Sequence, residues 1–112
     1  MKTRAELITA TLLALNVLAA GQAPEAEDVE TVDGFIDGKI AELNRRDIIF
    51  FTDTQNFEDE FVDPLATLLA DEAAPSFGQA RNPDSRAEAI SRLYAMRPST
   101  YVSGSVLKTD YF

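Results

Sequence analysis

The 112-residue chain contains no cysteine, no histidine and no tryptophan. The lack of cysteine excludes disulfide scaffolds, thiolate zinc sites and cysteine nucleophiles. The lack of histidine removes the usual general base and the commonest metal ligand. Cations are also scarce, with 10 Lys and Arg against 19 Asp and Glu, whereas a DNA-gripping surface needs clustered cations. We therefore expect no catalytic residue, no cofactor, no metal ion and no sequence-specific DNA binding.

The acidic residues are concentrated in the middle of the chain. Residues 24–75 hold fifteen Asp and Glu against three Lys and Arg, whereas residues 1–23 and 76–112 have net charges of +1 and +2. Such a surplus is typical of a solvated face that keeps a protein in solution. It also suits a surface that must not adhere to a polyanion, or one that meets a basic partner. The sequence alone leaves these interpretations open.

Residues 1–23 imitate a signal peptide, with basic residues, an apolar run and then small residues. A helix over residues 3–20 explains the pattern better. Thr3 and Glu6 have the spacing of a capping box, apolar residues follow at helical spacing, and Gly21 is a natural C-cap. The apolar run is too short and too polar to span a membrane.

Three further helices are predicted. The second begins at Pro24, in the first helical position, and carries Arg45 and Arg46 in its last turn. The third covers residues 64–74, after a short turn near residues 57–62, and starts with Asp63 as N-cap and proline as first residue.

The fourth helix covers residues 83–96, with Asn82 as N-cap and Pro83 as first residue. Its pattern divides the helix into two sides. The core side consists of Ala87, Ile90, Leu93 and Tyr94, and the solvent side carries Arg86, Arg92 and Arg97.

Two details of the second helix and its exit allow alternatives. Gly34 and Gly38 are either two weak helix positions, each costing up to about 1 kcal/mol relative to alanine, or a small-residue strip where another backbone approaches closely. The apolar residues 48–51 are either a buried strand or a core plug after the helix, and we favour an extended segment.

Residues 98–112 differ from the rest because they are rich in β-prone residues and end in two aromatics. Such a tail is costly to leave in water, so we expect it to dock on its own domain or on a neighbour, as a strand or in a groove. The predicted fold is mainly α: a small bundle of about four helices over residues 1–97, followed by an extended C-terminal docking tail over residues 98–112.

Three stretches of the chain carry a family resemblance. They are VLAAGQAP at 17–24 followed by Asp28, LLADEAAPSFG at 68–78, and RPSTY at 97–101 with DYF at 110–112. Together they resemble the head-to-tail adaptors of tailed bacteriophages, also called head–tail connector or tail accessory factor proteins. The likeness runs over most of the chain and consists of helix patterns and a tail.

The resemblance implies a structural virion protein of the phage neck, made in the host cytoplasm, without enzymatic activity and without a membrane. Such adaptors form a ring, usually of twelve copies, between the capsid portal and a tail or stopper protein, and genomic DNA passes through the channel. The alternative is a small exported or cytosolic helical binding protein with no virion role.

The resemblance also implies that the C-terminal extension grips the portal or adjacent subunits. The residues expected to dock on the portal are the apolar ones of the tail: Tyr101, Val102, Val106, Leu107, Tyr111 and Phe112. Arg86, Arg92 and Arg97 are expected to form salt bridges to the acidic flank of the next protomer, although exposed pairs are individually weak. An acidic channel wall would repel DNA and let it slide without adhering.

Overall fold

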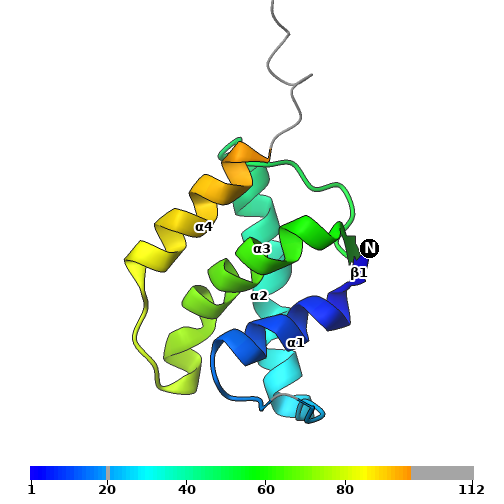
Figure 1. Cartoon of the computed structure of the whole chain (residues 1–112), viewed down its shortest axis with the longest axis vertical. Coiled ribbons are helices and arrows are strands. Elements are labelled where there is room, and N and C mark those ends of the chain that lie inside the picture. The colour runs from blue at the N-terminus through cyan, green and yellow to red at the C-terminus, as the bar shows by residue number, and fades with distance from the viewer. Residues whose placement is uncertain (20, 97–112) are drawn as a thin grey trace, which may run out of the picture.

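The computed structural model describes residues 1–19 and 21–96, and this part of the chain is mainly α-helical (Figure 1). The predicted fold class, a small bundle of about four helices, is confirmed there. The predicted tail at 98–112 and Arg97 lie outside the described residues. The helices are α1 (Arg4–Ala14), α2 (Ala26–Arg45), α3 (Asp59–Ala73), the short 3-10 helix η1 (Ala74–Phe77) and α4 (Pro83–Ala95), and the strands are β1 (Lys2–Thr3) and β2 (Asn56–Phe57).

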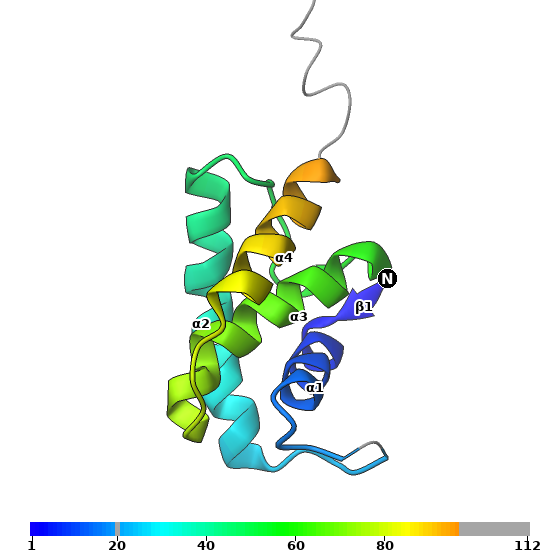
Figure 2. The same ribbon diagram turned by 60° about the vertical axis from the view of Figure 1, so that its left-hand side comes forward.

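Helix α3 is the centre of the bundle, because α1, α2 and α4 all pack against it (Figures 1 and 2). The two strands pair antiparallel, with Lys2 opposite Phe57, and bring the N-terminus beside the start of α3. The side chains with almost no exposure form one main core: Leu7, Leu12, Val32, Ile36, Leu43, Phe57, Leu65, Leu68, Leu69 and Leu93.

Helix α1 begins as predicted and ends early. The Glu6 N–H donates to Thr3 Oγ1 at 3.2 Å, and Glu6 Oε1 accepts from the Thr3 N–H at 2.9 Å, which completes the capping box. The predicted end near residue 20, with Gly21 as C-cap, is wrong. Asn16 takes a left-handed φ of 60°, and the Val17 N–H donates to the Leu12 carbonyl at 3.2 Å, which closes a Schellman cap.

Helix α2 starts two residues later than predicted, with Glu25 as N-cap and Pro24 before it. Its C-terminus repeats the device seen in α1, since Asp47 has a φ of 56° and the Ile48 N–H donates to the Leu43 carbonyl at 3.1 Å. Helix ends of this kind need a residue that tolerates φ > 0, and Asn and Asp do so better than most.

The expected extended segment at 48–51 forms no strand; Ile48 and Ile49 are buried as a core plug. The side chain of Asn44 explains this. Its Oδ1 accepts from the Phe51 N–H at 2.9 Å, and its Nδ2 donates to the Phe51 carbonyl at 3.0 Å. Both backbone groups of Phe51 are therefore held on α2 and take no part in a strand ladder.

Helix α3 starts at Asp59, so the predicted start at Asp63 and Pro64 is wrong. Pro64 lies inside the helix and is buried, although it cannot donate to the carbonyl four residues earlier. The turn before it is anchored by aromatic packing, with the Phe61 ring edge-on to Phe51 at a centroid distance of 5.4 Å. Tertiary contacts thus extend the helix across a residue that favours a first-turn position.

Helix α4 confirms its predicted cap, because the Asn82 side chain accepts from the Ser85 N–H at 3.1 Å. Its predicted core side is correct only in part. Leu93 is buried and Ile90 is half-buried, but Ala87 and Tyr94 are exposed and Ala89 is buried in their place. The buried line runs at a spacing of four residues, from Ala89 to Leu93.

Candidate functional site

A buried carboxylate on α3 holds the start of α4. The Asp71 side chain is 2% exposed. Its Oδ2 accepts from Arg81 Nη2 at 2.9 Å and Nε at 3.2 Å, and its Oδ1 accepts from the Asn82 N–H at 2.7 Å. Arg86 Nη1 adds a longer contact of 3.5 Å to Oδ2. The Asp71 cluster, defined as Asp71, Arg81, Asn82 and Arg86, therefore clamps the loop and first turn of α4 onto α3.

The charge state of this cluster follows from its contacts. Burial raises the pKa of Asp71, but the hydrogen bonds from Arg81 and the Asn82 N–H outweigh burial, so the pKa lies below its ordinary value. The hydrogen bond to Asp71 in turn raises the pKa of Arg81. Asp71 is therefore anionic at neutral pH, and the cluster acts as a structural clamp.

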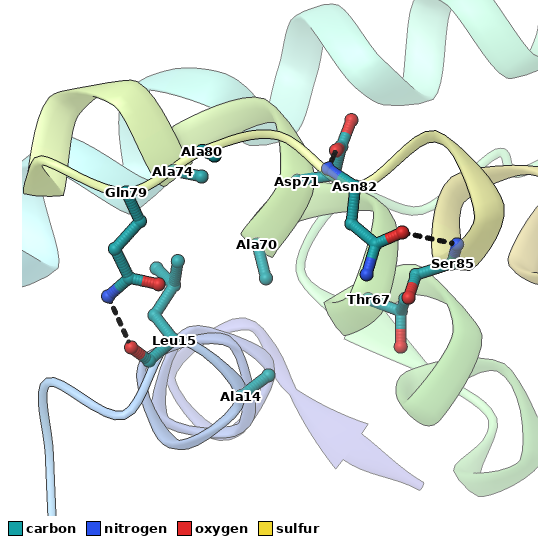
Figure 3. A pocket seen from close by; sticks show the side chains of 10 residues that line it. All are labelled: Ala14, Leu15, Thr67, Ala70, Asp71, Ala74, Gln79, Ala80, Asn82 and Ser85. Carbon is teal, nitrogen blue, oxygen red and sulfur yellow. Dashed lines mark hydrogen bonds between the residues drawn. The ribbon is translucent and has the colours of Figure 1, made fainter.

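A crevice of about 350 Å³ lies beside the cluster, between the end of α1, helix α3 and the start of α4 (Figure 3). Gln79 reaches across its mouth, where Nε2 donates to the Leu15 carbonyl at 2.6 Å. Figure 3 shows Asp71 turned toward the backbone of Asn82, and the Asn82 side chain turned toward Ser85. The remaining lining consists largely of alanines, Ala14, Ala70, Ala74 and Ala80. The polar side chains that line the crevice therefore mainly form hydrogen bonds between segments of the fold.

Two of the three arginines expected at a subunit contact, Arg86 and Arg92, have partners among the described residues. Besides Arg86 on Asp71, Arg92 Nη2 lies 3.3 Å from Asp63 Oδ2, and both of those side chains are exposed. Contacts of these two with a neighbouring protomer stay a prediction. Arg97 and all six expected portal-docking residues, Tyr101, Val102, Val106, Leu107, Tyr111 and Phe112, lie outside the described residues.

Two further charge networks were not predicted from the sequence. Lys39 on α2 is only 7% exposed and lies 3.1 Å from Glu42 and 3.0 Å from Glu72 on α3. The hydrogen bond from Lys39 lowers the pKa of Glu42. The spacing of Lys39 and Glu42 is a recognisable local signal, whereas the contact with Glu72 depends on how the helices pack.

The second network centres on Arg4 at the start of α1. Its Nε donates to Asp33 at 2.7 Å, and its Nη1 donates to Asp37 at 2.9 Å and to the Thr54 carbonyl at 3.1 Å. Arg4 thereby joins α1, α2 and the loop before β2.

Ion pairs neutralise part of the acidic middle segment. Among residues 24–75, seven of the fifteen acids form salt bridges with other described residues. Four acids at the start of α2 form none within the described part of the chain: Glu25, Glu27, Asp28 and Glu30. The positive end of the helix dipole stabilises carboxylates at this position. The dipole of α2 therefore explains why these four acids are tolerated side by side at its N-terminus.

Within residues 1–19 and 21–96, no group of three or more acidic side chains is arranged to hold a metal ion. No helix in the same ranges combines the length and apolar character that a membrane crossing requires. Comparison with protein-family models, curated proteins and solved structures found no match to this chain.

Proposed function

We propose that the protein is a structural adaptor of the neck of a tailed phage. Copies of the chain, twelve in the manner of the family it resembles, form a ring that joins the capsid portal to a tail or stopper protein. Residues 98–112 dock on the portal, and DNA passes through the ring without sequence-specific binding. The protein is made in the host cytoplasm and acts in the virion.

The observation that carries the proposal is that two of the three stretches that resemble the adaptors pack on one buried cluster. Residues 17–24 follow α1, and residues 68–78 form the end of α3 and η1. Val17 and Phe77 pack on a small buried cluster of Leu15, Ala73 and Ala74. Residues of the first two stretches therefore pack on one small cluster, and the Gln79–Leu15 hydrogen bond joins the segments beside it.

The charge of the chain agrees with a channel role. Twelve copies with a net charge of −9 each would carry about −108. A field of this sign repels a polyanion, so that DNA enclosed by the ring would slide past the wall. The acids at the start of α2 that form no ion pair with described residues contribute to this field.

Electron microscopy of the protein with purified portal particles tests the proposal. We expect a twelve-fold collar on the portal. A chain truncated after Arg97 should remain helical by circular dichroism and fail to bind. No collar with the full chain would contradict the adaptor role, and undiminished binding of the truncated chain would contradict the docking role of the tail.

The mass of the intact protein from its native source separates this proposal from the exported alternative. An adaptor keeps residues 1–23, because α1 contributes Leu7 and Leu12 to the core. A mature form beginning near Pro24 would instead indicate export and end the adaptor proposal.

A further inference from the structure

One end of the molecule carries exposed aromatic side chains. Phe50 and Tyr94 are each 56% exposed, among the few large apolar residues of the described chain that face solvent. Phe50 follows α2 closely, and Tyr94 lies in the last turn of α4. Figures 1 and 2 both show α2 and α4 ending at the same end of the molecule. We call Arg45, Phe50 and Tyr94 the aromatic end.

The exposure of Phe50 is fixed by its neighbours. Ile48 and Ile49 are buried, and Phe51 is fastened to Asn44 through both of its backbone groups. The Phe51 ring turns inward and lies edge-on to Phe57 at a centroid distance of 5.9 Å. Phe50 is therefore held outward on a rigid segment, and a preorganised side chain loses little freedom when it binds.

The third member of the aromatic end is a cation that forms no ion pair with the described residues. Arg45 is the last residue of α2 and forms no ion pair with the described residues, whereas Arg46 beside it lies 3.0 Å from Glu42. Aromatic residues and arginine are the types enriched at the centres of protein interfaces. A partner surface with an apolar pocket and a carboxylate would complement this combination.

The position of the aromatic end in the chain bears on what it could contact. Met96 is the last described residue and lies two positions after Tyr94. The predicted docking tail, residues 98–112, therefore begins four positions after Tyr94. A protein that holds the first residues of that segment must stand next to Tyr94. We propose that the aromatic end docks on the same partner as residues 98–112, which is the portal if the proposed function holds. Two linked contacts reinforce each other, because the second becomes intramolecular.

Affinity for purified portal particles tests this inference in the full-length protein. We expect Phe50→Ser to weaken binding about 30-fold or more, the loss at an interface hot spot. Arg45→Glu should also weaken binding, most strongly at low salt. Leu13→Ser is the matched control. Leu13 is also exposed, at 40%, and belongs to the last turn of α1. Figures 1 and 2 show that α1 ends away from the ends of α2 and α4, so replacement of Leu13 should leave affinity unchanged.

The outcomes separate this inference from the proposed function. Unchanged affinity of both Phe50→Ser and Arg45→Glu, with normal binding by the parent chain, overturns the docking surface and leaves the adaptor role standing. Absence of portal binding by the parent chain overturns both. If Phe50→Ser instead changes the oligomeric mass without portal, the surface meets a second copy. If it lowers the thermal midpoint only when residues 98–112 are present, the chain covers its own surface. Either result also overturns the inference.

Discussion

Replacing Gly34 and Gly38 with alanine should stabilise the isolated protein. Both glycines lie inside α2 and have helical backbone angles, since neither is among the residues with positive φ. A Cβ atom built at either position would meet nothing within 4 Å. The described fold therefore gives alanine full room at both sites. The close backbone approach allowed by the sequence does not occur within the described part of the chain.

The magnitude follows from the backbone alone. Glycine in a helix interior costs about 0.5–1 kcal/mol relative to alanine, mostly through the freedom of the unfolded chain. Each single variant should gain that amount, and the double variant should gain about 1–2 kcal/mol. For a protein of this size, 1 kcal/mol corresponds to about 4 °C in the thermal midpoint. Urea unfolding monitored by circular dichroism measures the gain. Ala41→Gly in the same helix is the control and should lose a similar amount.

A loss of stability in either single variant would refute this reasoning, because it would mean that the added methyl group meets an atom. Ring assembly on the portal then distinguishes the two explanations of the glycines. Variants that fold better and assemble normally identify the glycines as weak helix positions. Variants that fold better but fail to assemble identify a strip against which a neighbouring protomer packs.

Three further predictions concern the charge and capping contacts. Thr3→Ala should lower the free energy of unfolding by about 1 kcal/mol, measured in urea, because the first turn of α1 loses its cap. Asp71→Ala should lower the free energy of unfolding by about 2–3 kcal/mol, because the Asn82 N–H, Arg81 and Arg86 lose their carboxylate partner. Glu88→Ala, on the exposed side of α4, is the control and should change the free energy of unfolding little. The folded-state pKa values of Asp71 and Glu42 lie below their ordinary values of 3.8 and 4.5. The two carboxylates therefore stabilise the folded state fully above their ordinary pKa values, and this contribution is lost as the pH falls through their folded-state pKa values. Urea midpoints should decline below about pH 4.5, and the decline should be less steep in Asp71→Asn.

Helix starts with a side-chain cap were predictable from the sequence. The Thr3–Glu6 box and the Asn82–Pro83 pair act within four residues, so their spacing contains the whole interaction. The ends of α1 and α2 were harder, because Asn16 and Asp47 stop helices by a backbone conformation that leaves no fixed sequence pattern. Glycine is the usual signal for that conformation, and here the chain uses Gly21 in a loop instead.

Pairing across helices could not be predicted from spacing. The sequence placed Arg86 and Arg92 on the solvent side of the last helix, and the structure supplies the carboxylates Asp71 and Asp63 from α3. Which residues of two helices meet depends on their rotation and offset, and those depend on how the whole core packs. For the same reason, the contact between Lys39 on α2 and Glu72 on α3 could not be predicted from the sequence.

In the proposed ring, the in-chain pairs also indicate which arginine a neighbouring protomer can use. A guanidinium has five N–H donors, so a pair with one carboxylate leaves donors for another. The pair of Arg92 with Asp63 is exposed, and such pairs contribute about 0–1 kcal/mol, so a carboxylate of the next protomer could share or replace Asp63 at little cost.

Arg86 differs because its partner is the buried Asp71, and moving it away would weaken the clamp on α4. We therefore expect Arg92→Ala to reduce ring assembly on the portal without changing the urea midpoint, and Arg86→Ala to lower the midpoint. Both are measured on the same preparations, by mass in solution and by unfolding. Normal assembly of Arg92→Ala, together with defective assembly of an Arg86→Ala variant of unchanged stability, would instead assign the protomer contact to Arg86.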